Sequence, residues 1–164
     1  MADDLTPAEE RMQLQPGIFP VLEQDFARVV EVWEASVRAT HHFVRDEDIE
    51  IFRPLVQQAL PQLTQFACVR DEMGRVAVFT AVEEGKVEML FMHPAARGQG
   101  GGKRLLHHAV TVFGASILDV NEQNEQALKF YLHQGFEVVG RSALDSTGKP
   151  YPLLHMRLAG PRAA

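Results

Sequence analysis

The residues best suited to chemistry form a glycine-rich segment, HPAARGQGGGKRLL, at positions 93–106. This segment follows an apolar run and precedes a helical pattern, so N–H groups at the helix start would point outward without partners. Such N–H groups, together with the helix dipole and the guanidinium of Arg97, suit a phosphate or a pyrophosphate. The segment therefore predicts an anion site, and the alternative is a flexible surface loop.

The spacing of the glycines separates three known loop patterns. The phosphate loop of nucleotide hydrolases, G-x-x-x-x-G-K-[ST], fails because Arg97 and Arg104 stand at its first glycine and its hydroxyl position. The dinucleotide fingerprint G-x-G-x-x-G/A fails because its third glycine falls on Lys103 when it starts at Gly98, and on Leu105 when it starts at Gly100. Arg97, Gly100 and Gly102 instead match the pattern [RQ]-x-x-G-x-[GA].

The composition excludes several classes of function. The chain has 164 residues, 46% of them hydrophobic, which suits one domain, and it contains no apolar run long enough to span a membrane. The net charge of −6 and the absence of a basic run argue against nucleic acid as a partner. The lone cysteine, Cys68, permits no intrachain disulfide and fits a cytoplasmic location. Neighbouring histidines at 41–42 and 107–108 point apart, so we expect no metal site.

The hydrophobic pattern predicts the elements that position this segment. Helical periodicity is typical of four segments, 25–39, 46–60, 100–113 and 124–134. Apolar or alternating runs bounded by turn residues predict strands at 17–22, 65–70, 75–82, 86–92, 116–120, 136–140 and 153–158. Pro54 would kink or split the second helix. We expect a mixed sheet with helices packed on it, in one domain over residues 17–164, after a loose tail at 1–16.

Two motifs, in this order, resemble those of the GNAT superfamily of N-acetyltransferases. The first is LFMHPAARGQGGG at 90–102, between a strand and an apolar helix. The second is VNEQNEQALKFYLHQGF at 120–136, which is similar to the pattern N-x-x-N-x-x-A-x-x-F-Y-x-x-x-G-F. Segments 36–43 and 140–155 are similar to the bacterial YjaB-like group. Gly101 stands where many relatives have an aliphatic residue, so we expect a more flexible helix start.

The resemblance implies an α/β (α+β) GNAT fold: a central mixed, mostly antiparallel sheet of six to seven strands, with about four helices on its faces. The fourth and fifth strands, here 86–92 and 116–120, would splay apart. The pantetheine arm of the co-substrate acetyl-CoA would then lie between them, and an N–H group near Phe91 would polarise the thioester carbonyl. The implied cofactor-binding residues are Leu90, Phe91, Met92, Arg97, Gly98, Gln99, Gly100, Gly101, Gly102, Lys103, Asn121, Asn124 and Tyr131.

The resemblance also assigns a general acid, Tyr131, which would protonate the departing thiolate. A phenol with a pKa of about 10 is well matched to that task. The alternative is that Tyr131 only packs against the sheet. Two residues compete for the role of general base. Glu88 lies where family members often place a carboxylate, and His41 offers an imidazole that accepts a proton near pH 7. Their alternatives are a solvent-facing strand residue and a polar contact at a helix end.

The acceptor pocket of this fold usually lies between the first two helices, where His41, His42 and Phe43 are found. The polar segment 141–152 is too long for a tight hairpin, and loops of this length are often functional. Asp145 and Tyr151 in this segment would reach the acceptor amine, and an acidic residue suits a cationic substrate.

These observations lead to two hypotheses of different class. The first is an enzyme that transfers an acetyl group from acetyl-CoA directly to a primary amine, which would be a lysine side chain, a polyamine or a small amine metabolite. The second is a non-catalytic coenzyme A-binding sensor or interaction module, because a fold does not determine a function. Tyr131 favours the enzyme, since a non-catalytic module needs no acid. The edge strands would allow a homodimer.

Overall fold

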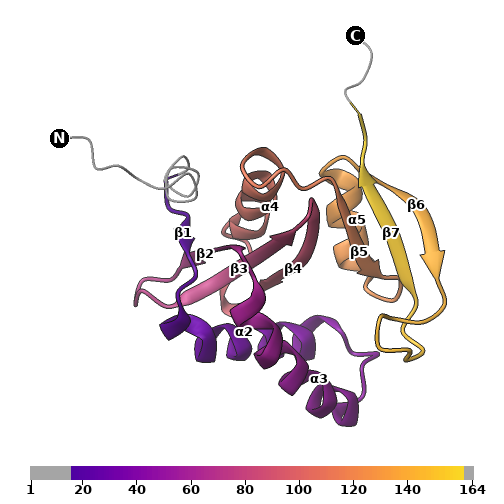
Figure 1. The fold of residues 1–164 in the computed structure, drawn as a ribbon, viewed down its shortest axis with the longest axis horizontal. Coiled ribbons are helices and arrows are strands. Elements are labelled where there is room, and N and C mark those ends of the chain that lie inside the picture. Colours follow the sequence, from indigo (N-terminus) through magenta and orange to yellow (C-terminus); the bar gives the residue numbers. More distant parts are fainter. Residues whose placement is uncertain (1–15, 161–164) are drawn as a thin grey trace.

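The computed structural model describes residues 16–160, which fold into a sheet with helices on both faces (Figure 1). The strands are β1 (Phe19–Pro20), β2 (Gln65–Arg70), β3 (Val76–Glu83), β4 (Lys86–Met92), β5 (Ile117–Asn121), β6 (Phe136–Ser142) and β7 (Leu153–Leu158). The α-helices within these residues are α2 (Phe26–Thr40), α3 (Asp46–Ala59), α4 (Gly101–Thr111) and α5 (Glu125–His133). Short 3₁₀ turns are η1 (Glu23–Asp25), η2 (Leu60–Gln62) and η3 (Pro94–Ala96). The expected tail lies outside the described residues up to position 15.

The strand order β1-β2-β3-β4-β5-β7-β6 determines where the molecule opens. Every neighbouring pair is antiparallel except β4 and β5, so the expected mixed, mostly antiparallel sheet is confirmed. The parallel pair is joined only at Lys86–Ile117 and Val87–Leu118. Beyond Val87 the two strands separate, which confirms the expected splay. The sheet is thereby divided into a β1–β4 part and a β5–β7–β6 part.

Two apolar clusters hold the helices on opposite faces, because successive strand side chains point to opposite sides. The helices α2 and α3 pack on one face, and Trp33, Ile49 and Phe79 are buried there. The helix α4 packs on the other face, where Leu105 and Val78 are buried, and α5 covers the same face of the β5–β7–β6 part. Figure 1 shows α2 and α3 on one side of β2–β4 and α4 on the other.

Three elements differ in detail from the sequence-based expectation. The first strand has only two residues, since Pro20 has no N–H group to donate to β2. Pro54 does not split its helix, which runs unbroken through α3; Pro54 and Glu50 are both exposed, so water can bond the carbonyl that Pro54 leaves unpaired. The strand β6 extends to Ser142, two residues further than expected. Within residues 16–160, no helix is long and apolar enough to cross a membrane.

Candidate functional site

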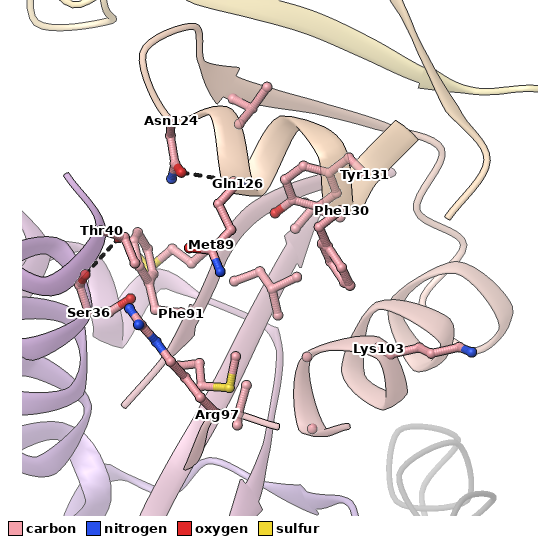
Figure 2. Close-up of a pocket in the computed structure, with 18 of the residues that line it drawn as sticks. Ser36, Thr40, Met89, Phe91, Arg97, Lys103, Asn124, Gln126, Phe130 and Tyr131 are labelled. Carbon is pink, nitrogen blue, oxygen red and sulfur yellow. Dashed lines mark hydrogen bonds between the residues drawn. The ribbon is translucent and has the colours of Figure 1, made fainter. Parts of the chain in front are cut away.

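A cavity of about 420 Å³ lies where β4 and β5 separate (Figure 2). A β-bulge shapes its β4 wall: Met89 pairs with Ala81 and Val87 pairs with Val82, so Glu88 is the extra residue. A bulge bends its strand and redirects a side chain. Here the bulged Glu88 lines the cavity, and the hydroxyl of Thr80 donates to the carbonyl of Met89 at 2.8 Å. The bulge therefore helps β4 to diverge from β5.

The glycine-rich segment forms one end of the cavity. Gly98 and Gly100 adopt φ angles of 77° and 78°, a left-handed conformation that favours glycine. The first N–H group of α4 with a helical partner belongs to Arg104, which donates to the carbonyl of Gly100 at 3.1 Å. The three preceding N–H groups, of residues 101–103, have no backbone partner within residues 16–160, as is usual at a helix start. This arrangement fits a pyrophosphate, and Gly98, Gly100, Gly101 and Gly102 all line the cavity.

Gly101 has a packing role that the sequence did not reveal. A β-carbon at this position would lie 2.8 Å from Cγ2 of Val78, so a side chain cannot fit between α4 and β3 without movement. The expected flexible helix start is thus a close helix–sheet contact. Gly102 differs, because its β-carbon would meet only the end of Met92, at 3.9 Å.

The charged and polar residues of this loop are distributed unequally. Arg97 and Lys103 both line the cavity, whereas Gln99 does not. Figure 2 shows the Lys103 side chain directed away from the cavity and the Arg97 guanidinium directed towards α2. Arg97 is exposed, and its guanidinium forms no hydrogen bond or ion pair within residues 16–160. Its guanidinium is therefore available to an anion.

The structure places Tyr131 both in the apolar core and in the wall of the cavity. Its side chain is buried and packs edge-on against Phe136, with ring centroids 6.1 Å apart. Its hydroxyl points into the cavity (Figure 2) and makes no hydrogen bond within the described part of the chain. Burial raises the pKa of Tyr131 well above its ordinary value of 10, so the phenol stays protonated at neutral pH.

The side chains of His41 and Asn124 meet in the wall of the first cavity, although 83 positions separate them. The hydroxyl of Thr40 donates to the carbonyl of Ser36 at 2.7 Å, so it accepts from Nδ1 of His41, also at 2.7 Å. Nε2 of His41 is then the acceptor for the Asn124 amide at 3.4 Å. Burial lowers the pKa of His41 to about 4, which keeps the ring neutral. The Asn124 oxygen caps α5 by accepting from the N–H group of Ala127 at 3.2 Å.

A second cavity, of about 380 Å³, adjoins the first on its α2–α3 side. The two cavities share His41, Met89, Phe91 and Asn121 in their walls. Most of the remaining lining of the second cavity is apolar: Trp33, Val37, Val44, Phe52, Leu55, Val56, Ala59 and Leu153. An apolar chain that ends in an amine would therefore fit through the second cavity towards the first.

The loop between β6 and β7 forms part of the wall of this second cavity. Buried Asp48 on α3 accepts from the Tyr151 hydroxyl and pairs with Nζ of Lys149 at 3.0 Å. Asp145 accepts from the N–H groups of Thr147 and Lys149, at 2.9 and 3.0 Å, so it shapes the loop as well as lining the cavity. The Tyr151 ring lines the cavity, but its hydroxyl is already bonded within the fold.

The remaining expected acceptor residues differ in position. Phe43 lies between the rings of His41 and Tyr151, with centroid distances of 5.2 and 6.0 Å, and supports both. His42 is exposed and lines neither cavity. Sequence reasoning missed four polar residues of the first cavity: Ser36, Thr40, Asp119 and Gln126. Gln126 lies within the second motif, and Asp119 is the one charged residue of its strand, so both carried a signal in the sequence.

Comparison with known proteins agrees with this geometry. Residues 62–138 match the family model of the acetyltransferase (GNAT) domain. The peptidyl-lysine N-acetyltransferase YjaB of Salmonella typhimurium is 40% identical over 129 residues, which are 79% of this chain and 88% of that protein. The solution structure of apo YjaB from Escherichia coli matches with a TM-score of 0.79 and 36% identity, over 88% of this chain and 97% of that one.

A more distant structure shares the fold alone. The PaiA N-acetyltransferase of Thermoplasma acidophilum, solved in complex with coenzyme A, matches with a TM-score of 0.64 at 19% identity. The match covers 87% of this chain and 98% of the PaiA chain. Within the residues described here, no group of three or more metal-ligating side chains is assembled. The chain belongs to the GNAT family of acetyltransferases, enzymes that transfer an acetyl group from acetyl-CoA to an amine.

Proposed function

We propose that the protein acetylates lysine side chains of other proteins, with Tyr131 as the general acid. One observation carries this proposal. The buried, protonated phenol of Tyr131 points into the cleft where β4 and β5 separate, and its hydroxyl has no hydrogen-bond partner within residues 16–160. Its YjaB relatives are peptidyl-lysine N-acetyltransferases by name, which supports lysine as the acceptor.

The residues that would hold acetyl-CoA surround this hydroxyl. The free N–H groups at the start of α4 and the guanidinium of Arg97 bind the pyrophosphate. The edge of β4 beyond Val87, which β5 leaves unpaired, bonds the pantetheine amides. An N–H group of this edge near Leu90 or Phe91 polarises the carbonyl. Acetyl-CoA supplies the acetyl group as a thioester, and Tyr131 gives its proton to the sulfur that departs.

Glu88 handles the proton of the acceptor amine, either directly or through a water molecule. The bulge exposes its carboxylate in the cavity, and it makes no hydrogen bond or ion pair within the described residues. His41 is the poorer candidate, because both of its ring nitrogens already have hydrogen-bond partners, Thr40 at Nδ1 and Asn124 at Nε2. We assign His41 a positioning role, in which it holds the start of α5 against α2.

The second cavity receives the acceptor. Its apolar lining suits the methylene stem of a lysine, while the negative charges of Glu88 and Asp145 attract the ammonium group. A polyamine carries further ammonium groups along its chain, which the mostly apolar lining would have to desolvate, and a small amine metabolite lacks the long methylene stem. Lysine in a peptide therefore fits the cavity better.

The test is a measurement of coenzyme A release and of peptide acetylation with the purified chain. We would compare a lysine peptide, the same peptide with arginine in place of lysine, spermidine and free lysine. We expect thiol release with the lysine peptide, a mass increase of one acetyl group, and loss of both in Tyr131→Phe. Release that is faster with spermidine would overturn the peptide assignment. Tight acetyl-CoA binding without transfer to any amine would favour the sensor hypothesis.

A further inference from the structure

A second cluster of chemically capable side chains lies on the β5–β7–β6 part of the sheet. Asp119 on β5 faces His155 on β7, and His155 faces Gly140 on β6. Because alternate residues share a face, Ser142 lies on the same face as Gly140. A β-carbon at Gly140 would lie 3.4 Å from the His155 ring, so the missing side chain leaves room for this ring.

The three polar side chains form a directed chain of hydrogen bonds. Nδ1 of His155 lies 2.6 Å from Oδ1 of Asp119, and Nε2 of His155 lies 2.7 Å from Oγ of Ser142. Burial opposes ionisation of Asp119, but bonds from Lys86 and His155 outweigh it, and the pKa of this carboxyl lies below its ordinary value. The ionised carboxylate can only accept, so Nδ1 carries the proton. Nε2 is therefore the acceptor for the Ser142 hydroxyl.

Lys86 holds the carboxylate in place from the neighbouring strand. Its Nζ lies 2.8 Å from Oδ2 of Asp119, so both carboxylate oxygens have partners. A nucleophile bonded to a base that a third group orients is the arrangement that activates serine in acyl-transfer enzymes. All three residues stand on hydrogen-bonded strands, which limits their movement.

Two further features bear on reactivity. The side chain of His155 is 37% exposed and Ser142 is partly exposed, so a reagent can reach them. The N–H groups of Ala143 and Leu144, directly after Ser142, donate to no backbone carbonyl in residues 16–160. Free N–H groups next to a nucleophile can stabilise a developing oxyanion. Ser142 pairs across the sheet with Leu153 on β7, and Leu153 pairs with Asn121 on β5. Leu153 and Asn121 both line the second cavity, so this cavity lies beside the site.

We propose that Ser142, His155 and Asp119 form a second reactive site that hydrolyses short-chain acyl esters. Ser142 Oγ attacks the ester carbonyl while its proton passes to Nε2 of His155. The bond to the alcohol breaks, and the alcohol takes that proton from His155. Water then attacks the acyl-serine with His155 as base, which releases the carboxylic acid and restores the hydroxyl. Because Ser142 is only partly exposed, a small, uncrowded acyl group reaches its hydroxyl most readily.

The test uses the full chain without acetyl-CoA or an amine, so its result does not depend on acetyl transfer. The chain would be treated with a fluorophosphonate probe, and the labelled residue would be located by peptide mass spectrometry. Hydrolysis of p-nitrophenyl acetate would be measured for the wild type, Ser142→Ala, His155→Gln and Asp119→Asn. Ser116→Ala is the matched control, because Ser116 is an exposed serine with no histidine partner within residues 16–160.

We expect the probe on Ser142 and a loss of hydrolysis of roughly tenfold or more in Ser142→Ala and His155→Gln. Asp119→Asn should lose a similar factor, because an amide can reverse the tautomer of His155. Ser116→Ala should match the wild type. Labelling of the wild type elsewhere than at Ser142 would overturn the proposal even if a variant fails to fold. Hydrolysis by a folded Ser142→Ala within twofold of the wild type would overturn it too.

Discussion

Replacement of Tyr131 by phenylalanine removes one oxygen atom from the cleft and leaves the packing in place. The ring is 9% exposed and contacts Phe136 edge-on, and phenylalanine keeps this contact. The lost hydroxyl has no hydrogen-bond partner within residues 16–160, so its removal breaks no bond in the described fold. We therefore expect the melting temperature of Tyr131→Phe to stay within about 2 °C of the wild type.

The expected loss falls on the rate of acetyl transfer. A positioned general acid contributes roughly 10²–10⁴-fold, which corresponds to about 3–5 kcal/mol of transition-state stabilisation. The loss should appear in kcat rather than in the affinity for coenzyme A, because the proton moves only as the thiolate departs. Burial raises the pKa of Tyr131, so the wild-type phenol keeps its proton and the rate should not decline between pH 7 and about pH 9.

Two measurements on the same preparation decide this prediction. Steady-state thiol release gives kcat for both proteins, and titration calorimetry gives the dissociation constant of coenzyme A. A kcat of Tyr131→Phe within threefold of the wild type would refute the general-acid assignment. A fall in affinity as large as the fall in rate would show instead that the hydroxyl binds the cofactor.

Three further predictions concern packing, a buried histidine and the loop over the second cavity. Gly101→Ala should destabilise the fold by about 1–3 kcal/mol, because the new methyl group would lie 2.8 Å from a side chain of β3. Gly102→Ala is the control and should not destabilise the fold. Equal melting temperatures of the two variants would refute the packing role of Gly101. Both ring nitrogens of buried His108 lack a partner within residues 16–160, so His108→Phe should raise the free energy of unfolding by about 1–3 kcal/mol. Burial, with the charge of His107, lowers the pKa of His108. The wild type should therefore lose stability below pH 6.5, because there the unfolded chain binds a proton that the folded chain does not. Denaturant melts of His108→Phe at pH 5 and pH 8 should not show this loss. Asp48→Asn should loosen the Tyr151 loop and raise the acceptor KM roughly tenfold with kcat kept, and an unchanged KM would contradict the role of that loop.

Much of the fold followed from local sequence signals. The helix and strand segments follow from the spacing of apolar residues, since a helix repeats every 3.6 residues and a strand every two. The prediction of an anion site follows from glycines that permit left-handed turns at Gly98 and Gly100, next to a helix start. The splay of the central strands, which the structure confirms, was predicted from a family resemblance. The roles proposed for Tyr131 and for the acetyl-CoA-binding residues came from the same resemblance, because spacing alone does not identify a ligand.

Only the tertiary structure decided which distant residues meet. The contact of His41 with Asn124 spans 83 positions, and that of Asp48 with Tyr151 spans 103. The bulge at Glu88 and the close approach of Gly101 to Val78 depend on the register and depth of packing against β3. Asp119, His155 and Ser142 come together because β7 inserts between β5 and β6. Local propensities determine each element along the chain, whereas the order of strands and the burial of both sheet faces determine which side chains share a site.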